Sequence, residues 1–272
     1  GAVAFAEKNG LSYKYYQPAN GSDATDDDRI AAMRQAVEGG AEIVVTPGFL
    51  QAAALETVAK ENPEVKFVFV DGWNLGLANV TAISYHEEES GFFAGYAAVM
   101  DGYTKLGGTF GGAGTNAACN RFAYGYVQGM QAAAAELGTN VEATISFLYG
   151  GSFSASTELQ TQISGWYTNG TEVVFACGGS MLQSVKAAAA ETENGKIIGV
   201  DTDQSAESDR VITSAFKNLS GSVDLTLTKW FEGKWDGELA DKLSNLGVGD
   251  EATGLPTAEG SWRFENFTVD QY

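Results

Sequence analysis

The sequence predicts an α/β protein with two lobes, each built on a parallel sheet. Short apolar segments alternate with segments of helical periodicity, and strands separated by helices form parallel sheets. Segments such as residues 43–45 and 173–175 are apolar throughout, which is typical of sheets covered on both faces. Polar and Gly-rich residues follow several of these strands. In a parallel sheet this carboxyl edge is where ligands bind.

The first half of the chain begins with a helical segment that Gly10 ends. Residues 13–16 then alternate as in a strand. A helix follows from about Thr25, because three aspartates stand in its first turn, where the helix dipole favours negative charge. The remaining elements of this half are strands 42–45, 66–70 and 80–85 and helices 50–60 and 87–100.

The second half repeats the alternation of strands and helices up to Asp203, after which this pattern changes. Its expected elements are strands 105–110, 141–148, 172–176, 196–200 and 211–216, helices 120–137, 157–167, 182–190 and 223–231, and an irregular segment 233–272. We expect an N-terminal lobe of residues 1–104 plus about 211–232. The C-terminal lobe would hold residues 105–210 plus about 233–272, and the crossovers between the lobes would form a hinged cleft.

Composition limits the kinds of molecule that the protein is expected to bind. The chain has 272 residues, enough for two lobes that each bury a core. Its net charge of −19 disfavours nucleic acid and anionic lipid as partners. A single histidine does not favour a His-rich zinc site, and no metal or cofactor is expected. Cys119 and Cys177 are interpreted as small buried hydrophobic residues, although a disulfide between them stays open.

The carboxyl ends of the strands supply the candidate ligand-binding residues. Asp201 and Asp203 end one strand, where a carboxylate can accept hydrogen bonds from two sugar hydroxyls, or can cap a helix instead. Phe49, Trp73 and Phe153 follow other strands and can stack on a flat ring, or pack on a neighbouring helix. Lys217 can donate to a ligand hydroxyl or carbonyl, unless it is a solvated surface lysine.

Two Gly-rich loops, residues 111–114 and 178–180, precede helices and could in principle hold phosphate. Neither has the spacing of a phosphate-binding loop, so close approach of the backbone to a neutral ligand is the preferred interpretation. The segment 86–89 is either an acidic helix start or a metal or acid/base cluster. No serine-hydrolase, zinc-protease or EF-hand motif is found, which favours binding over catalysis.

Four segments together resemble the basic membrane protein (BMP) family, which includes the purine nucleoside receptor lipoproteins. They are residues 82–98 (AISYHEEESGFFAGYAA), 121–129 (RFAYGYVQG), 198–204 (IGVDTDQ) and 211–218 (VITSAFKN). The resemblance covers nearly the whole chain. It implies a type I periplasmic-binding-protein fold with two Rossmann-like lobes joined by a hinge. It also implies an extracytoplasmic receptor that passes a nucleoside, expected to be a purine nucleoside, to an ABC transporter permease.

The same resemblance implies roles for individual residues. Asp201 would bind ribose hydroxyls, Lys217 would be the site lysine, and Phe153 would stack on the base. Gly179 and Ser180 would line the pocket, with Ser184 at the start of the following helix.

The family's first strand and lipid-carrying cysteine have no counterpart here, so we expect residue 1 to lie inside the first lobe. The protein would then be anchored by lipid at the outer face of the bacterial cytoplasmic membrane, or be periplasmic, through a segment outside this sequence. Two alternatives stay open: an enzyme acting on nucleosides or sugars on the same scaffold, and a ligand-sensing ectodomain.

Overall fold

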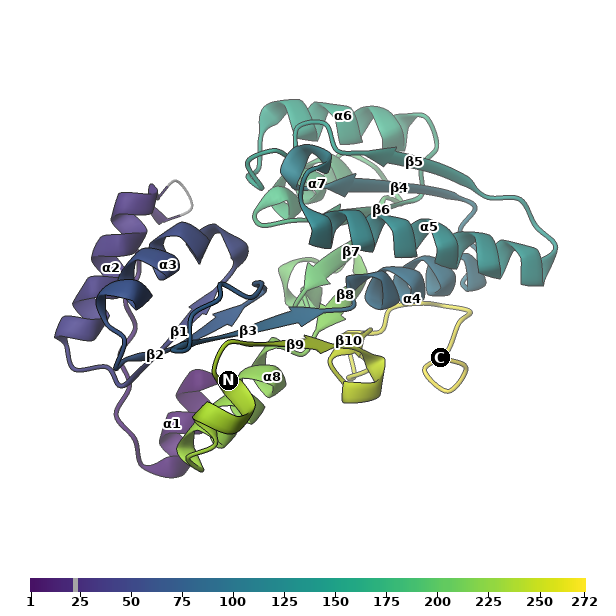
Figure 1. The fold of residues 1–272 in the computed structure, drawn as a ribbon. Helices are drawn as coiled ribbons and strands as arrows, with labels where there is room; N and C mark the ends of the chain where they lie inside the picture. Colours follow the sequence, from purple (N-terminus) through teal and green to yellow (C-terminus); the bar gives the residue numbers. More distant parts are fainter. Residues whose placement is uncertain (22–23) are drawn as a thin grey trace. The chain divides into compact units, whose positions relative to one another are not determined.

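The computed structural model describes residues 1–21 and 24–272, and the chain divides into two compact units (Figure 1). Unit 1 comprises Gly1–Tyr85 and Leu219–Leu246, and unit 2 comprises His86–Asn218 and Gly247–Tyr272. Each unit contains its own sheet and its own helices, which confirms the predicted α/β class.

Unit 1 is built on a four-stranded parallel sheet in the order β1-β2-β3-β9. The strands are β1 (Ile43–Pro47), β2 (Lys66–Val70), β3 (Val80–Tyr85) and β9 (Lys242–Leu246). The helices are α1 (Ala2–Asn9), α2 (Asp26–Glu38), α3 (Ala52–Glu61) and α8 (Leu219–Phe231). The apolar stripe of α3, including Leu55 and Val58, packs with Phe67 and Phe69 of β2 to form the core of this unit.

Local sequence signals account for the helix ends in unit 1. Thr25 accepts a hydrogen bond from the amide of Asp28, whose carboxylate in turn accepts one from the amide of Thr25. This reciprocal capping satisfies two backbone groups that the helix leaves without partners. Gly10 ends α1 in the left-handed conformation with φ 67°, as its position predicts.

Two expectations for unit 1 are wrong. Residues 13–16 form no strand, and Tyr13 and Tyr15 are 56% and 81% exposed, because no strand pairs with this segment in the described part of the chain. The segment 233–272 contains regular structure that its glycines obscure. Its strand β9 pairs with β3 from Thr81↔Lys242 to Tyr85↔Leu246, which makes it part of unit 1.

Unit 2 is built on a six-stranded sheet in the order β10-β8-β7-β6-β4-β5, antiparallel only between β10 and β8. Its strands are β4 (Lys105–Phe110), β5 (Glu142–Ser146), β6 (Val173–Cys177), β7 (Lys196–Asp201), β8 (Val211–Lys217) and β10 (Thr253–Gly254). Its helices are α4 (Glu87–Met100), α5 (Ala117–Leu137), α6 (Thr157–Thr168) and α7 (Met181–Ala190).

Both faces of the unit 2 sheet are covered, as the apolar strands predict (Figure 1). Along β6, Val173, Phe175 and Cys177 join the core formed with α4 and α5. Val174 and Ala176, which point to the opposite face, join the core formed with α6 and α7. Neither face of β6 is therefore open to solvent. Its carboxyl end is the part of the strand where polar groups can contact a ligand.

The strand β8 lies in a different unit from the one that the sequence suggests. Instead of returning to the first lobe, it pairs in parallel with β7, from Ile197↔Val211 to Asp201↔Phe216. The helix α4 also belongs to unit 2, because it packs along α5 and against β8. This pairing places Lys217, the last residue of β8, next to the end of β7.

Glycines allow α4 and α5 to approach closely. A Cβ atom on Gly125 would clash with the carbonyl oxygen of Glu88, and one on Gly129 would clash with that of Phe92. Gly91 and Gly95 of α4 face backbone atoms of α5 in the same way. The glycines in residues 82–98 and 121–129 are thus explained by helix packing, and this packing fixes the start of α4 against the start of α5.

We predict that Gly125→Ala lowers the free energy of unfolding by about 1–3 kcal/mol, because the helices must separate to admit the methyl group. Gly165→Ala in α6 is the matched control. No atom lies near its added Cβ, so better helix propensity should raise stability by up to about 1 kcal/mol. Denaturant unfolding of both variants measures the difference. Equal effects of the two substitutions would contradict this account of the α4–α5 packing.

Candidate functional site

Lys217 ends β8 with a buried amine that lies between two carboxylates of unit 2. Its Nζ is 3.2 Å from Asp201 Oδ1 and 3.4 Å from Glu87 Oε1, and 5.2 Å from the centre of the Phe122 ring. The side chains of Lys217 and Glu87 are only 3% and 2% exposed. Charges this deeply buried require ionic partners, and the aromatic face adds a favourable contact with the cation.

Arg121 completes the arrangement from α5. Its Nε lies 2.6 Å from Glu87 Oε2 and 3.7 Å from Glu88 Oε2, and its side chain is 41% exposed. We call Glu87, Arg121, Asp201 and Lys217 the charge cluster. In the charge cluster, the carboxylates of Glu87 and Asp201 offset the positive charges of Lys217 and Arg121, and Glu88 supplies a further carboxylate near Arg121.

The charge cluster is assembled from the ends of secondary-structure elements. Asp201 and Lys217 end the neighbouring strands β7 and β8, while Glu87 opens α4 and Arg121 lies near the start of α5. The carboxyl edge of a parallel sheet is the general location of ligand sites in this class of fold.

Asp201 is the member of the charge cluster that can also reach a ligand. Its backbone is left-handed, with φ 63°, a conformation that Asp tolerates better than most residues. Its side chain is 37% exposed, although Oδ1 is buried against Lys217. No hydrogen bond from a described residue reaches Oδ2. A carboxylate held in this way can accept hydrogen bonds from hydroxyl groups while Lys217 balances its charge.

The two Gly-rich loops make room for Phe153. A Cβ atom on Gly111 would clash with the Phe153 ring, and one on Gly179 would clash with the Phe153 carbonyl oxygen, which accepts a hydrogen bond from the amide of Ser180 at 2.9 Å. Phe153 itself has a left-handed backbone, with φ 58°. The sequence assigns the close approach at these glycines to a ligand, whereas the structure shows that it is made by Phe153.

Ser180 and Ser184 hold the same loop. Ser180 Oγ accepts a hydrogen bond from the amide of Ala155 at 3.0 Å. Ser184 Oγ accepts one from the amide of Ser156 and donates one to the carbonyl oxygen of that residue, both at 2.9 Å. Because both capacities of the buried Ser184 hydroxyl are used inside the protein, its observed role is to position the loop that carries Phe153.

Asp203 lies two residues beyond Asp201 but makes different contacts. Its Oδ1 accepts a hydrogen bond from the amide of Ser205 at 3.0 Å, and its Oδ2 accepts one from the Ser261 hydroxyl. Partial burial opposes ionisation, but these bonds and the charge of Arg263 outweigh it and hold the pKa of Asp203 below its usual value. This arrangement ties the loop after β7 to the C-terminal segment.

Phe49 belongs to unit 1, in the short helix η2 (Phe49–Gln51) that follows β1. Trp73, another aromatic residue after a strand of unit 1, is 49% exposed and stands edge-on to Phe69, with 5.4 Å between ring centroids. Both aromatic residues therefore follow carboxyl ends of the unit 1 sheet, as the sequence predicts.

The segment 86–89 forms the acidic start of α4, and its glutamates make different contacts. Glu87 turns inward to the charge cluster, whereas Glu89 Oε2 accepts hydrogen bonds from the Val248 amide at 2.7 Å and the Thr253 hydroxyl at 2.6 Å. Within residues 1–21 and 24–272, no group of three or more His, Cys, Asp or Glu side chains could hold a metal ion. Sequence reasoning singled out the segment 86–89 but not Glu87 within it, and it did not single out Arg121, although both residues lie in the segments that carry the family resemblance.

The two cysteines are free and buried in the same core as α4 and α5. Burial raises the pKa of the Cys177 thiol, and a hydrogen bond with Cys119 raises it further. The Cys177 thiol therefore stays protonated, and both cysteines pack as small core residues.

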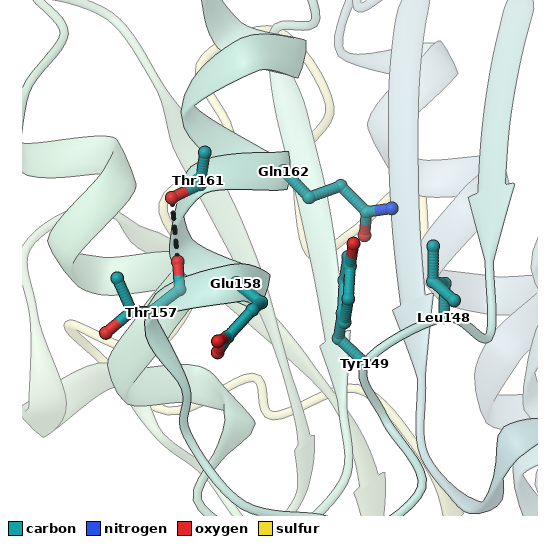
Figure 2. Close-up of a pocket in the computed structure, with 6 residues that line it drawn as sticks. All are labelled: Leu148, Tyr149, Thr157, Glu158, Thr161 and Gln162. Carbon is teal, nitrogen blue, oxygen red and sulfur yellow. Dashed lines mark hydrogen bonds between the residues drawn. The ribbon is translucent and has the colours of Figure 1, made fainter.

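A pocket of about 370 Å³ opens beside the loop that follows β5 (Figure 2). The side chain of Tyr149 points toward Gln162 of α6, and the hydroxyl of Thr161 donates a hydrogen bond to the carbonyl of Thr157 at 2.8 Å. The residues that line it are Leu148, Tyr149, Thr157, Glu158, Thr161 and Gln162. The eight residues predicted from the sequence are not among them.

Comparison with known proteins supports the resemblance. A family model described as "ABC transporter substrate-binding protein PnrA-like" matches residues 1–260. The ABC transporter nucleoside-binding protein BmpA of Lactococcus lactis subsp. cremoris is 28% identical over 260 residues, covering 89% of this chain and 71% of that protein. Basic membrane protein B of Borreliella burgdorferi is 28% identical over 227 residues, covering 80% and 64%. The chain thus spans roughly two thirds of these relatives.

Solved structures confirm the fold. A solute-binding protein of an ABC transporter system from Aeropyrum pernix K1 matches with a TM-score of 0.74 at 22% identity, covering 94% of this chain and 70% of that one. Another from Conexibacter woesei matches with a TM-score of 0.72 at 20% identity, covering 99% and 85%. The type I periplasmic-binding-protein fold that the resemblance implies is therefore correct.

We predict that Asp203→Asn lowers the free energy of unfolding by about 0.5–1 kcal/mol at neutral pH, as expected for surface hydrogen bonds to a carboxylate. Because the folded-state pKa of Asp203 lies below its ordinary value of 3.8, the stabilisation is present above that pH and is lost as the pH falls further. The difference between wild type and variant should therefore shrink below about pH 4. Denaturant unfolding across pH 3–7 tests this, with Asp270→Asn at an exposed residue as control. A difference that grows with acidity would contradict the prediction.

Proposed function

This chain belongs to the PnrA-like family of ABC transporter substrate-binding proteins, and we propose from that premise that it binds a nucleoside, with purine nucleosides preferred. The observation that carries the proposal is the half-exposed carboxylate of Asp201, held at 3.2 Å from the buried amine of Lys217. The family consists of binding proteins, so the enzyme alternative is set aside.

Ribose is the part of the ligand that Asp201 would recognise. Adjacent hydroxyls on a ribose ring can both donate to one carboxylate, and Oδ2 of Asp201 can accept their hydrogen bonds. Lys217 fixes the orientation of the carboxylate through Oδ1, so little side-chain freedom is lost on binding. A ligand without hydroxyls at these positions would leave the carboxylate without donors.

The base would meet an aromatic side chain. Phe153 is partly buried and anchored by the Gly111, Gly179 and Ser180 contacts, which restrict its ring before any ligand arrives. Stacking on a flat heterocycle suits such a ring, and a purine offers the larger area. The name of the Lactococcus lactis relative, a nucleoside-binding protein, agrees with this proposal.

Members of this family act outside the cytoplasm, where the substrate-binding protein delivers its ligand to a transporter. We propose a nucleoside-importing ABC permease as the partner, and a lipid anchor as the attachment to the membrane. In the part of the chain that the structure describes, no helix is both long and apolar enough to cross a bilayer.

We predict that Asp201→Ala weakens ribonucleoside binding by about ten- to a hundredfold, since a hydrogen bond to a charged group contributes roughly 1.5–3 kcal/mol. Asp201→Asn keeps the shape but loses the charge, so its affinity should fall between those of wild type and Asp201→Ala. Titration calorimetry with a ribonucleoside and its 2′,3′-dideoxy analogue yields the coupling energy directly. The dideoxy analogue should bind wild type weakly and lose little more in the variant.

If Asp201→Ala weakens both ligands equally, Asp201 does not recognise the ribose hydroxyls. If wild type binds no nucleoside at all, the proposed ligand class is wrong. Enzyme-dependent release of free base from a nucleoside would restore the enzyme alternative.

A further inference from the structure

Glu87 contacts both cations of the charge cluster, although it has almost no exposed surface. One of its oxygens, Oε1, lies 3.4 Å from Lys217 Nζ, and the other, Oε2, lies 2.6 Å from Arg121 Nε. Its side chain is 2% exposed, so it cannot itself be a contact surface for a ligand of any size. Any effect of Glu87 on a bound ligand must therefore be electrostatic, because Glu87 offsets the charges of Lys217 and Arg121.

The charge balance depends on Glu87. Glu87 supplies one of the negative charges that offset Lys217 and Arg121, and Asp201, whose side chain is 37% exposed, supplies another. Without the charge of Glu87, the surroundings of Lys217 and Arg121 would be more positive by one unit. Electrostatic interactions are stronger in a buried setting than in water, so this single charge would act on any ligand bound at Asp201.

An anionic ligand is therefore at a disadvantage in the wild-type site. It must give up hydration to bind near the carboxylate of Asp201, and Glu87 offsets the positive charges of Lys217 and Arg121 that would otherwise attract it. A neutral ligand with hydroxyl groups loses nothing by comparison, because it needs only the acceptor oxygens of Asp201.

We propose that Glu87 is a specificity-determining residue, which neutralises Lys217 from inside the protein and so restricts the site to uncharged nucleosides. This inference rests on the proposed nucleoside site. Arg121 limits how far Glu87 offsets the positive charge of Lys217, because the Glu87 carboxylate contacts both cations. A purely structural role for Glu87 would alter stability without changing how the site ranks charged and neutral ligands.

The test compares two ligands of nearly the same shape, adenosine-5′-carboxamide and adenosine-5′-carboxylate, which differ by one negative charge. Competition binding against adenosine at fixed ionic strength gives the ratio of their affinities for each form of the protein. Wild type should prefer the carboxamide. Glu87→Gln should reduce that preference by about tenfold, as expected for the loss of one partly screened charge.

Arg121→Gln should change the preference in the opposite direction, because it removes one positive charge from the charge cluster. Its side chain is 41% exposed, so this variant provides a test even if Glu87→Gln does not fold. Glu87→Asp keeps the charge and should retain the wild-type preference. The control is Glu142→Gln, which makes the same change in net charge at an exposed residue of β5. It should leave the ratio within about twofold of wild type.

Unchanged ratios in Glu87→Gln and Arg121→Gln, with adenosine still bound, would overturn the role of Glu87 and leave the nucleoside site intact. Shifts of the same sign in both variants would overturn it as well. A wild-type protein that binds neither adenosine nor its two derivatives, nor other nucleosides, would instead overturn the proposed function.

Discussion

A buried lysine is the constraint on which the site in unit 2 depends. Lys217 is 3% exposed, and a single buried ammonium group without partners would destabilise the fold. Two carboxylates and an aromatic face stabilise it, and they come from β7, α4 and α5. The same contacts that make the amine tolerable also orient Asp201, whose outer oxygen is then available to a ligand. Stability and recognition are thus coupled through one side chain.

The surrounding packing explains why these groups meet. Glycines at the crossing of α4 and α5 let the helices approach at backbone distance, which brings Glu87 at one helix start close to Arg121 near the other. The parallel pairing of β7 and β8 sets Asp201 beside Lys217. After the carboxyl end of β6, the other neighbour of β7, Ser180 and Ser184 tether the loop that carries Phe153. Contacts within the protein therefore hold these residues in place without a ligand.

Much of this arrangement could be predicted from the sequence, because parallel strands and their polar carboxyl ends leave strong local patterns. The strand ends predict Asp201 and Lys217 as candidate ligand-binding residues in this way. Residues 13–16 have the alternation of a strand, but a strand also needs a partner, which local pattern does not reveal. The unit to which β8 belongs depends on long-range pairing for the same reason. Glu87 was hidden among three consecutive glutamates, because composition alone cannot show which carboxylate turns inward.

The account is tested most directly by a crystal structure of the protein with a bound purine nucleoside. It predicts that ribose hydroxyls lie within hydrogen-bonding distance of Asp201 Oδ2, while Lys217 keeps its contacts with Asp201 Oδ1 and Glu87. A nucleoside bound elsewhere, for example in the pocket beside Tyr149, would contradict the account, as would a Lys217 side chain that had turned away from Glu87.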